Sequence, residues 1–335
     1  MSSGRKGREL PREVLISKAM SNLLRHSAEK ENVKISPEGY VNVADLLAWR
    51  KLKSLKATFP EILDAVANSD KKRFSLLYVP PAAAGQQPRS EGKTQELAVQ
   101  TANSEEKQEN ATAHALSVKD TDPSHFLIRA TQGHSMKSVD TTLFLERLTL
   151  ADPEDKSAPP LPDTVVHGTY HGAWPLILAS GGLKSMGRTQ VHFATGPSLD
   201  EVLPNGRQGP TAKLDPDLTK QSVISGMRSD AQILIYIDLK KALAAGCPFY
   251  RSENGVILSE GIDVVGKENE DKSDETKQKV VPLEFFDVVV ERKVGLGILW
   301  ENGRVVQELP AELASKKNPK GVRVESSRRG RGGKR

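Results

Sequence analysis

Four short clusters along the chain place arginine and histidine among apolar residues and small turn residues. They are LLRHS at 23–27, IRATQGHS at 128–135, VHGTYH at 166–171 and QVHFAT at 190–195. Five of the seven histidines fall in these clusters, together with Arg25 and Arg129. A buried guanidinium or imidazole is costly unless it is paired or binds an anion. The clusters therefore predict one cationic site that is assembled from distant segments.

The N-terminal part of the chain has the pattern of a small helical unit. Apolar residues recur at helical spacing from Glu13 to Ala28, which predicts an amphipathic helix with Arg25 and His26 in its last turns. We expect a short strand over 40–43, Asp45 as the N-cap of the next helix, a further helix around 62–67 and a strand over 73–79. Helices followed by a hairpin-like pair favour a winged-helix lobe over residues 12–80.

Two segments have the composition of chain that does not fold by itself. There is no aromatic residue between Tyr78 and Phe126, and small and polar residues dominate there. Such a composition cannot offset the entropy lost on ordering, so we expect a disordered insertion over 81–122 and a disordered N-terminus over 1–11. A second polar insertion, KENEDKSDETKQK, interrupts the later part of the chain at 267–279.

The later block, residues 123–310, has the pattern of many short strands with one or two helices. Strands are expected at 126–130, 164–170, 190–194, 232–239, 255–258 and 285–291, and a helix over 174–180 that ends at Gly181 and Gly182. The parallel βαβ rhythm of a Rossmann fold is missing, as is a GxGxxG after a strand. The sequence therefore predicts an α+β protein.

Composition limits the class of protein. The chain has 335 residues, enough for about two domains, and its mean hydropathy is −0.46. No stretch approaches the ~18 apolar residues of a membrane span, and the N-terminus lacks the apolar segment of a secretory signal. The single cysteine, Cys247, cannot form an internal disulfide, which fits the cytoplasm, the nucleus or both.

The net charge of +5 comes from the C-terminus. Residues 316–335 carry nine Lys and Arg against one Glu, so this segment is +8 and the remaining residues are near −3. We expect residues 311–335 to form a disordered basic tail. Such a tail can neutralise phosphates without sequence preference, or it can be a solvated or nuclear-targeting segment.

Five segments together resemble the tRNA 2′-phosphotransferase family. They are RH at 25–26, IRATQGHS at 128–135, VHGTYHGAWPLILASGGLKSMGRTQVHFATG at 166–196, VISGMRSDAQILIYIDL at 223–239 and FYRSENGVILSEG at 249–261. They occur in family order and cover roughly residues 12–80 and 123–300. The resemblance implies an N-terminal winged-helix lobe that binds RNA and a C-terminal lobe of the ADP-ribosyltransferase type.

The resemblance also implies the reaction. Members of the family remove the internal 2′-phosphate of spliced tRNA with NAD as acceptor. The 2′-phosphate first expels nicotinamide from NAD, and the neighbouring ribose hydroxyl then attacks that phosphate. The products are 2′-hydroxyl RNA and ADP-ribose 1″,2″-cyclic phosphate. We accordingly expect a monomer that uses NAD as co-substrate, no metal and 2′-phosphorylated tRNA as its partner.

The family's catalytic set of three arginines and a histidine is assigned by resemblance to Arg25, His26, Arg129 and Arg228, with Arg188 as a rival to Arg228. Arg129 and Arg228 would grip the 2′-phosphate, since a guanidinium matches phosphate oxygens bidentately. Arg25 and His26 would drive the second step, in which an imidazole exchanges protons with the attacking and leaving hydroxyls.

The NAD contacts are expected in the second lobe. By resemblance they come from QGHS at 132–135 and HGT at 167–169, where a glycine allows the cofactor to approach the backbone closely. His192 lies on an expected strand and points away from its two apolar neighbours. The candidate cofactor-binding residues are His134, Ser135, His167, Gly168, Thr169 and His192.

Two other functions fit parts of the pattern. An ADP-ribosyltransferase acting on nucleic-acid ends or protein would use the same NAD lobe and stop after the first step. A winged-helix RNA-binding protein would carry an inactive second lobe. The pair Arg25 and His26 favours the phosphotransferase over the first alternative, and the HGT and QGHS segments argue against the second. No HExxH or paired CxxC suggests a metal site.

Overall fold

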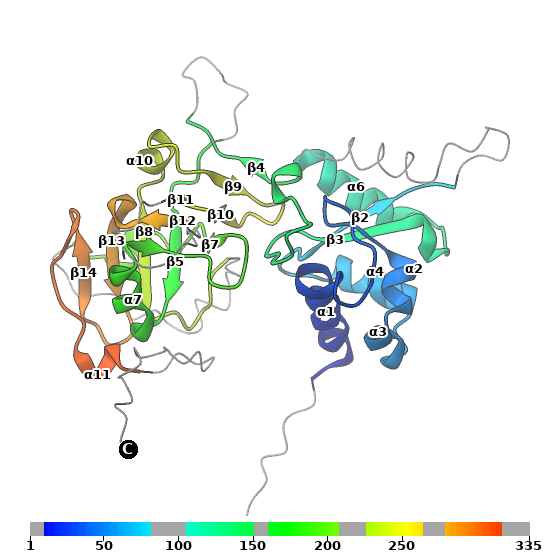
Figure 1. The fold of residues 1–335 in the computed structure, drawn as a ribbon, viewed down its shortest axis with the longest axis horizontal. Coiled ribbons are helices and arrows are strands. Elements are labelled where there is room, and N and C mark those ends of the chain that lie inside the picture. The colour runs from blue at the N-terminus through cyan, green and yellow to red at the C-terminus, as the bar shows by residue number, and fades with distance from the viewer. Residues whose placement is uncertain (1–9, 82–104, 151–159, 208–225, 264–278, 317–335) are drawn as a thin grey trace, which may run out of the picture.

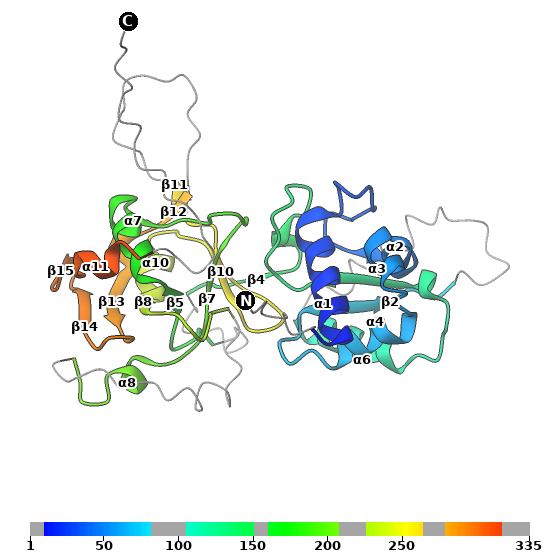
Figure 2. The same ribbon diagram turned by 90° about the horizontal axis from the view of Figure 1, so that it is seen from below.

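The computed structural model describes residues 10–81, 105–150, 160–207, 226–263 and 279–316. Within them the chain is α+β, as expected, with helices around four small sheets. The elements form two lobes side by side (Figures 1 and 2). One lobe holds the N-terminal helices and the other holds the C-terminal strands.

The first lobe surrounds a three-stranded antiparallel sheet of order β1-β3-β2. Its elements are α1 (Arg12–Asn22), η1 (Leu23–Ser27), β1 (Val41–Asn42), α2 (Val43–Ala48), α3 (Arg50–Ser54), α4 (Phe59–Ala67), β2 (Phe74–Tyr78), α6 (Glu105–Ser117), η2 (Pro123–His125), β3 (Phe126–Ala130) and η3 (Thr141–Leu143). Its core includes the fully buried side chains of Met20, Leu24, Leu46, Ile62 and Ile128.

The predicted first helix changes its winding where its polar residues begin. The α-helix passes into one π-helical turn, in which the backbone N–H of Ala28 donates to the carbonyl of Leu23 at 3.0 Å. Leu23 and Leu24 stay in the core, while Arg25 and His26 are only partly buried. Single π turns of this kind are often found at functional sites.

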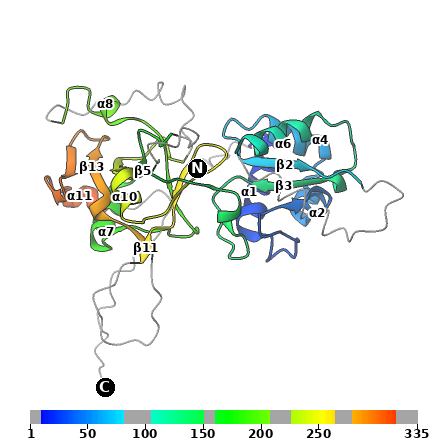
Figure 3. The ribbon, with the colours of Figure 1, turned by 90° about the horizontal axis from the view of Figure 1, so that it is seen from above.

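Two sequence-based expectations for the first lobe are wrong. Asn42, not Asp45, caps the helix after β1, because its side-chain oxygen accepts from the backbone N–H of Ala44 at 2.9 Å. Part of the expected disordered insertion 81–122 is helix α6, which packs along β2 (Figure 3). Ala115 is fully buried in the core of the first lobe, so a small apolar side chain anchors this helix where an aromatic one was expected to be needed.

The boundary between the lobes also differs from the expected 123–310 block. Strand β3 pairs with β1 and β2, and Met136, Val139 and Phe144 join the core of the first lobe. The chain therefore enters the second lobe about twenty residues later than expected.

The second lobe contains three sheets, of order β4-β9-β10-β7, β11-β12-β6 and β15-β14-β13-β8-β5. Its strands are β4 (Glu146–Arg147), β5 (Val166–Thr169), β6 (Gly182–Leu183), β7 (Val191–Phe193), β8 (Ile233–Ile237), β9 (Phe249–Arg251), β10 (Ile257–Ser259), β11 (Ile262–Asp263), β12 (Lys279–Pro282), β13 (Phe286–Glu291), β14 (Gly297–Glu301) and β15 (Arg304–Val305). Its helices are η4 (His171–Ala173), α7 (Trp174–Ala179), α8 (Leu199–Val202), α10 (Leu239–Ala244), η5 (Leu283–Phe285) and α11 (Ala311–Ala314).

The expected strands of this lobe are confirmed by β5, β7, β8, β10 and β13, and the expected helix by α7. Gly181, at φ +73°, adopts the left-handed conformation just after that helix. In the disordered tail expected over 311–335, residues 311–314 instead form α11, which packs against η4, and residues 317–335 lie outside the described residues. The insertion at 267–279 lies outside the described residues except for Lys279, which starts β12.

Among the described residues, no helix is both long enough and apolar enough to cross a membrane.

Candidate active site

A cleft of about 780 Å³ brings together segments of both lobes. Its walls come from η1, the turn before β2, the loop after β3, strand β5, the loop 184–188, strand β7, the segment 226–228 and Asn254. Six of the residues that line it are cationic: Arg25, Lys71, Arg73, Lys184, Arg188 and Arg228. Three more are histidines, and none of the described lining residues is Asp or Glu. The cleft is therefore suited to bind anions.

Two nitrogens of the Arg25 guanidinium have no hydrogen-bond partner in the described structure. Its Nε and Nη2 atoms are buried and make no hydrogen bond. Burial, and then the charges of Arg188 and Arg73, lower the pKa of Arg25 to about 10, so the side chain stays protonated at neutral pH. A buried cation of this kind needs an anionic partner. A phosphate group in the cleft would supply that partner.

His26 is held by the loop that follows β3. Its Nδ1 lies 2.9 Å from the Oγ of Ser135, and the backbone N–H of Ser135 donates to the carbonyl of Arg25 at 2.9 Å. Burial, Arg188 and Arg25 lower the pKa of His26, so the imidazole is neutral at pH 7. With Nδ1 facing Ser135, the other ring nitrogen, Nε2, is the one left to exchange protons with a ligand.

Two histidines from the second lobe are fixed by backbone carbonyls. His167 Nδ1 donates to the carbonyl of His192 at 2.9 Å, and His192 Nδ1 donates to the carbonyl of Gln190 at 3.0 Å. His192 Nε2 lies 2.7 Å from the side-chain oxygen of Gln132. Burial lowers the pKa of both rings, that of His192 to about 3. Both therefore enter the cleft as neutral rings of fixed orientation.

Gly168 and Thr169 line the cleft between these groups. A Cβ at Gly168 would lie 2.3 Å from Met227 Cγ and 2.7 Å from Ala231 Cβ. Because glycine has no side chain, Met227 can pack directly against the backbone of residue 168. From the sequence, we expected this glycine to let a ligand approach closely. The carbonyl of Thr169 accepts from the backbone N–H of Gln232 at 2.8 Å. This hydrogen bond holds the end of β5 against the segment 227–232.

Both rival arginines, Arg188 and Arg228, lie in the cleft. Arg228 donates to the hydroxyl of Tyr170 at 2.9 Å, and that hydroxyl donates to Asp230 at 3.0 Å. Arg188 lies near enough to Arg25 and His26 to lower the pKa of both. Arg188 is thus the arginine more closely coupled to the proposed catalytic pair.

Arg129 and His134 do not line the cleft. Arg129 is 1% exposed, and its guanidinium carbon lies 4.7 Å from the ring centre of Tyr40 and 4.4 Å from that of Phe144. His134 is also 1% exposed, and its pKa is lowered to about 3, first by burial and then by Arg25. The structure places both side chains behind the cleft, in the first lobe's interior.

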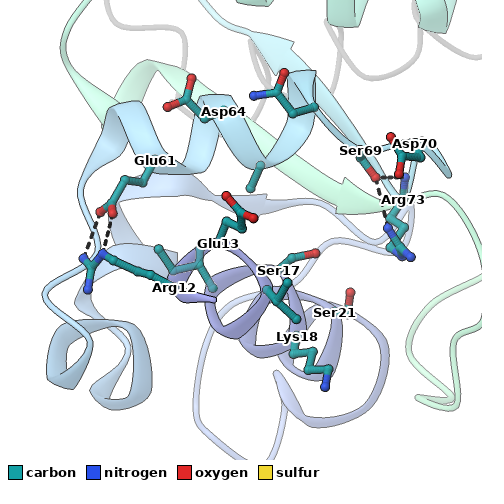
Figure 4. A pocket seen from close by; sticks show the side chains of 14 residues that line it. Arg12, Glu13, Ser17, Lys18, Ser21, Glu61, Asp64, Ser69, Asp70 and Arg73 are labelled. Atoms are coloured by element: carbon teal, nitrogen blue, oxygen red, sulfur yellow. Dashed lines mark hydrogen bonds and ion pairs between the residues drawn. The ribbon is translucent and has the colours of Figure 1, made fainter. Parts of the chain in front are cut away.

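Several cleft residues did not stand out in the sequence. Arg73 and Lys71 precede β2. Gln132 and Tyr170 belong to the clusters IRATQGHS and VHGTYH, but only other residues of these clusters were assigned a role. The run KKRF at 71–74 was a usable signal, because three cations stand directly before a buried strand. Arg73 Nη1 lies 3.4 Å from Ser69 Oγ (Figure 4).

No group of three or more metal-ligating side chains is found among the described residues. The positive charge of the cleft comes from its own guanidinium and ammonium groups.

The chain is similar to proteins of known function. The model of the family described as "RNA 2′-phosphotransferase, Tpt1 / KptA family" matches residues 11–261. Proteins named tRNA 2′-phosphotransferase 1 are similar to the chain: that of Danio rerio is 32% identical over 77% of this chain and 84% of its own length, and that of Homo sapiens 31% identical over 78% and 76%. The tRNA 2′-phosphotransferase of Saccharomyces cerevisiae is 29% identical over 76% and 81%. The chain belongs to the RNA 2′-phosphotransferase family.

Proposed function

We propose that the chain transfers the internal 2′-phosphate of spliced tRNA to NAD, giving 2′-hydroxyl RNA, nicotinamide and ADP-ribose 1″,2″-cyclic phosphate. The observation that carries the proposal is the cleft lined by six cations, three histidines and no described carboxylate. Phosphoryl transfer depends mainly on positioning and on stabilising charge. A cleft with this lining offers both to a phosphate.

Arg25, Arg73 and Arg188 are proposed to hold the transferred phosphate. Their charges act on one another, since Arg188 and Arg73 both lower the pKa of Arg25, and Arg25 has two buried nitrogens without a partner. Bidentate guanidinium contacts match the oxygens of a phosphate. Arg73 thus takes the role that the resemblance gave to Arg129, and Arg188 is preferred to Arg228.

His26 is proposed as the group that exchanges protons during the second step. Its lowered pKa keeps Nε2 available as a base at neutral pH, and Ser135 holds the ring through Nδ1. General acid–base catalysis needs this combination of a fixed ring and a suitable protonation state.

The second-lobe wall fits the co-substrate NAD. The pyrophosphate requires cations, which Lys184 and Arg228 supply, and the ribose hydroxyls require fixed hydrogen-bonding groups, which His167 and Thr169 supply. When bound there, NAD provides the ribose carbon that accepts the phosphate and nicotinamide as the leaving group. The two lobes are then proposed to be of the winged-helix and ADP-ribosyltransferase types.

The proposal is tested with a 2′-phosphorylated oligoribonucleotide. The 2′-hydroxyl product should form only when NAD is present, and it should form equally well in excess EDTA, because guanidinium groups provide the charge that metal enzymes take from Mg²⁺. Product formed without NAD, or activity that is lost on chelation and restored by a divalent ion, would contradict the proposal.

A further inference from the structure

The ends of three neighbouring strands meet at one end of the five-stranded sheet in the second lobe (Figure 1). Glu291, the last residue of β13, pairs with Ile233 at the start of β8, and Ile233 pairs with Thr169 at the end of β5. Thr169 also lines the cleft. The residues that follow β5 and β13 therefore lie close to those that precede β8, beside the cleft.

The turn that precedes β8 carries one of the cations of the cleft. We call it the 228–231 turn, and in it the backbone N–H of Ala231 donates to the carbonyl of Arg228 at 3.2 Å. Arg228 lines the cleft, and its Nη1 donates to the hydroxyl of Tyr170 at 2.9 Å. That hydroxyl donates to Asp230 of the same turn at 3.0 Å. The direction of the Arg228 guanidinium therefore depends on how the turn is held against the end of β5.

Arg292, the residue after β13, holds this turn from the interior. It is only 9% exposed. Its Nε donates to the carbonyl of Ala231 at 2.7 Å, and its Nη2 donates to the carbonyl of Ser229 at 2.9 Å. Its backbone N–H donates to the carbonyl of Gln232 at 3.0 Å. One residue thus donates three hydrogen bonds to carbonyls within four consecutive residues.

The two side-chain bonds make use of a property that is particular to arginine. The Nε–H and one Nη–H of a guanidinium point the same way from a rigid plane, so together they fix the position and the direction of two acceptors. The ammonium group of a lysine keeps the charge, but it lies at the end of a flexible stem and does not reproduce this fork. Arg292 therefore determines the shape of the turn as well as its attachment to the sheet.

The preceding residue, Glu291, holds the other side of the contact between Tyr170 and Arg228. Its Oε1 lies 2.8 Å from Nε2 of His171, the residue after Tyr170, and both side chains are at most 1% exposed. The backbone N–H of His171 donates to the side-chain oxygen of Gln232 at 3.0 Å. Two adjacent residues after β13 and at its end thus hold both segments that orient the Arg228 guanidinium.

We propose that Arg292 is a positioning residue for NAD, which fixes the 228–231 turn and so directs the guanidinium of Arg228 at the pyrophosphate of the co-substrate. The proposal rests on the proposed function, which gives Arg228 that ligand. Arg292 itself does not line the cleft and touches neither substrate. Because the 2′-phosphate is assigned to other arginines, a change at Arg292 acts on NAD and not on RNA.

The test measures the two substrates separately in Arg292→Lys. The dissociation constant for NAD, measured by calorimetry without RNA, and the KM for NAD should both rise about tenfold, as expected when a hydrogen bond to a charged group is lost. The kcat and the KM for 2′-phosphorylated RNA should stay within about twofold of wild type, because neither depends on Arg228. Arg304→Lys changes an exposed arginine on β15 of the same sheet, and this matched control should leave all four values unchanged.

A double-variant cycle separates positioning from a general loss of structure. In Arg228→Gln the guanidinium is already gone, so the addition of Arg292→Lys should raise the dissociation constant for NAD by less than about twofold. A rise of about tenfold in both backgrounds would show that Arg292 acts independently of Arg228, and it would overturn the proposal. A wild-type dissociation constant in Arg292→Lys, or an equal rise in the KM of both substrates, would also overturn it.

Tyr170→Phe tests the same arrangement from the side of the cleft. It removes the hydroxyl that joins Arg228 to Asp230 and leaves the interior untouched. The dissociation constant for NAD should rise, and this rise too should disappear in the Arg228→Gln background. If Arg292→Lys does not fold, a wild-type dissociation constant in Tyr170→Phe overturns the proposal. Absence of 2′-hydroxyl product from the wild-type protein with NAD would instead contradict the proposed function.

Discussion

His26 and Ser135 are 109 residues apart in the sequence, and the imidazole Nδ1 of one lies 2.9 Å from the hydroxyl of the other. The same loop is tied to the second lobe, since the backbone N–H of Thr189 donates to the carbonyl of His134 at 3.0 Å. The orientation of the imidazole therefore depends on both lobes.

Replacing His26 should separate the two halves of the reaction. In His26→Ala, the formation of 2′-hydroxyl RNA should slow by about 10²–10⁴-fold, the usual contribution of a general base or acid. Nicotinamide should still be released, about once per RNA bound. Ser135→Ala removes only the hydrogen bond that orients the ring and should slow product formation about fivefold. Quenched-flow measurement of both products checks this, and wild-type turnover in His26→Ala would show that the ring is structural.

The charge of Arg188 should be visible in the titration of His26. Burial and Arg188 lower the pKa of this imidazole, so the folded protein protonates it at lower pH than an unfolded chain does. Removing the charge in Arg188→Gln should raise the pKa toward the ordinary value of about 6.5. NMR titration of the ring reports the shift directly. Lys240→Gln, a change at an exposed site outside the cleft, is the matched control and should leave the pKa unchanged.

Arg73 and Arg129 should behave differently, although Arg129 lies on β3 and Arg73 directly precedes its neighbour β2. Arg73 lines the cleft, whereas Arg129 is stacked between Tyr40 and Phe144 in the interior. Arg73→Gln should lower kcat/KM for RNA about 100-fold, as expected for a lost contact to the transferred phosphate. Arg129→Met should leave kcat/KM per folded molecule within about twofold of wild type. A large loss in Arg129→Met, measured with the folded fraction known from circular dichroism, would return Arg129 to the catalytic set.

Stability should fall on mild acidification. His134 and His192 are buried with pKa values of about 3, while the unfolded chain binds their protons near pH 6.5. Below that pH the unfolded state binds more protons than the folded state, so the free energy of unfolding decreases as pH falls. Each histidine contributes a slope of up to about 1.4 kcal/mol per pH unit. Urea titrations between pH 5 and 6.5 should show a smaller slope in His134→Phe, and an unchanged slope would contradict the burial of a neutral ring.

The sequence predicted those helices and strands whose apolar residues follow a regular spacing. The first helix, the strands β5, β7, β8 and β13 and the helix α7 follow from the spacing of apolar residues and from Gly181. Helix α6 was missed because its buried residues are small, and the pairing of β3 with the first sheet was missed because local patterns do not reveal which strands pair across a long connection.

The candidate site was predicted in part. Arg25, His26, His167, Gly168, Thr169, His192 and Arg228 line the cleft, and Ser135 holds His26. Arg129 was assigned by resemblance to the family. In the structure it does not line the cleft, and its guanidinium lies between the rings of Tyr40 and Phe144 with its Nε buried and without a hydrogen bond. Arg73 lies in a turn four residues after Ser69, and it lines the cleft together with residues of the second lobe, an arrangement that the sequence does not show.

The central claim is that this cleft passes the 2′-phosphate of RNA to NAD, and the fate of that phosphate tests it most directly. An oligoribonucleotide with a radiolabelled internal 2′-phosphate is incubated with the protein and NAD, and the products are separated. The account predicts that all of the released label is found in ADP-ribose cyclic phosphate, with one nicotinamide released per 2′-hydroxyl formed. Label released as inorganic phosphate, or ADP-ribose that stays on RNA or protein as the final product, would contradict it.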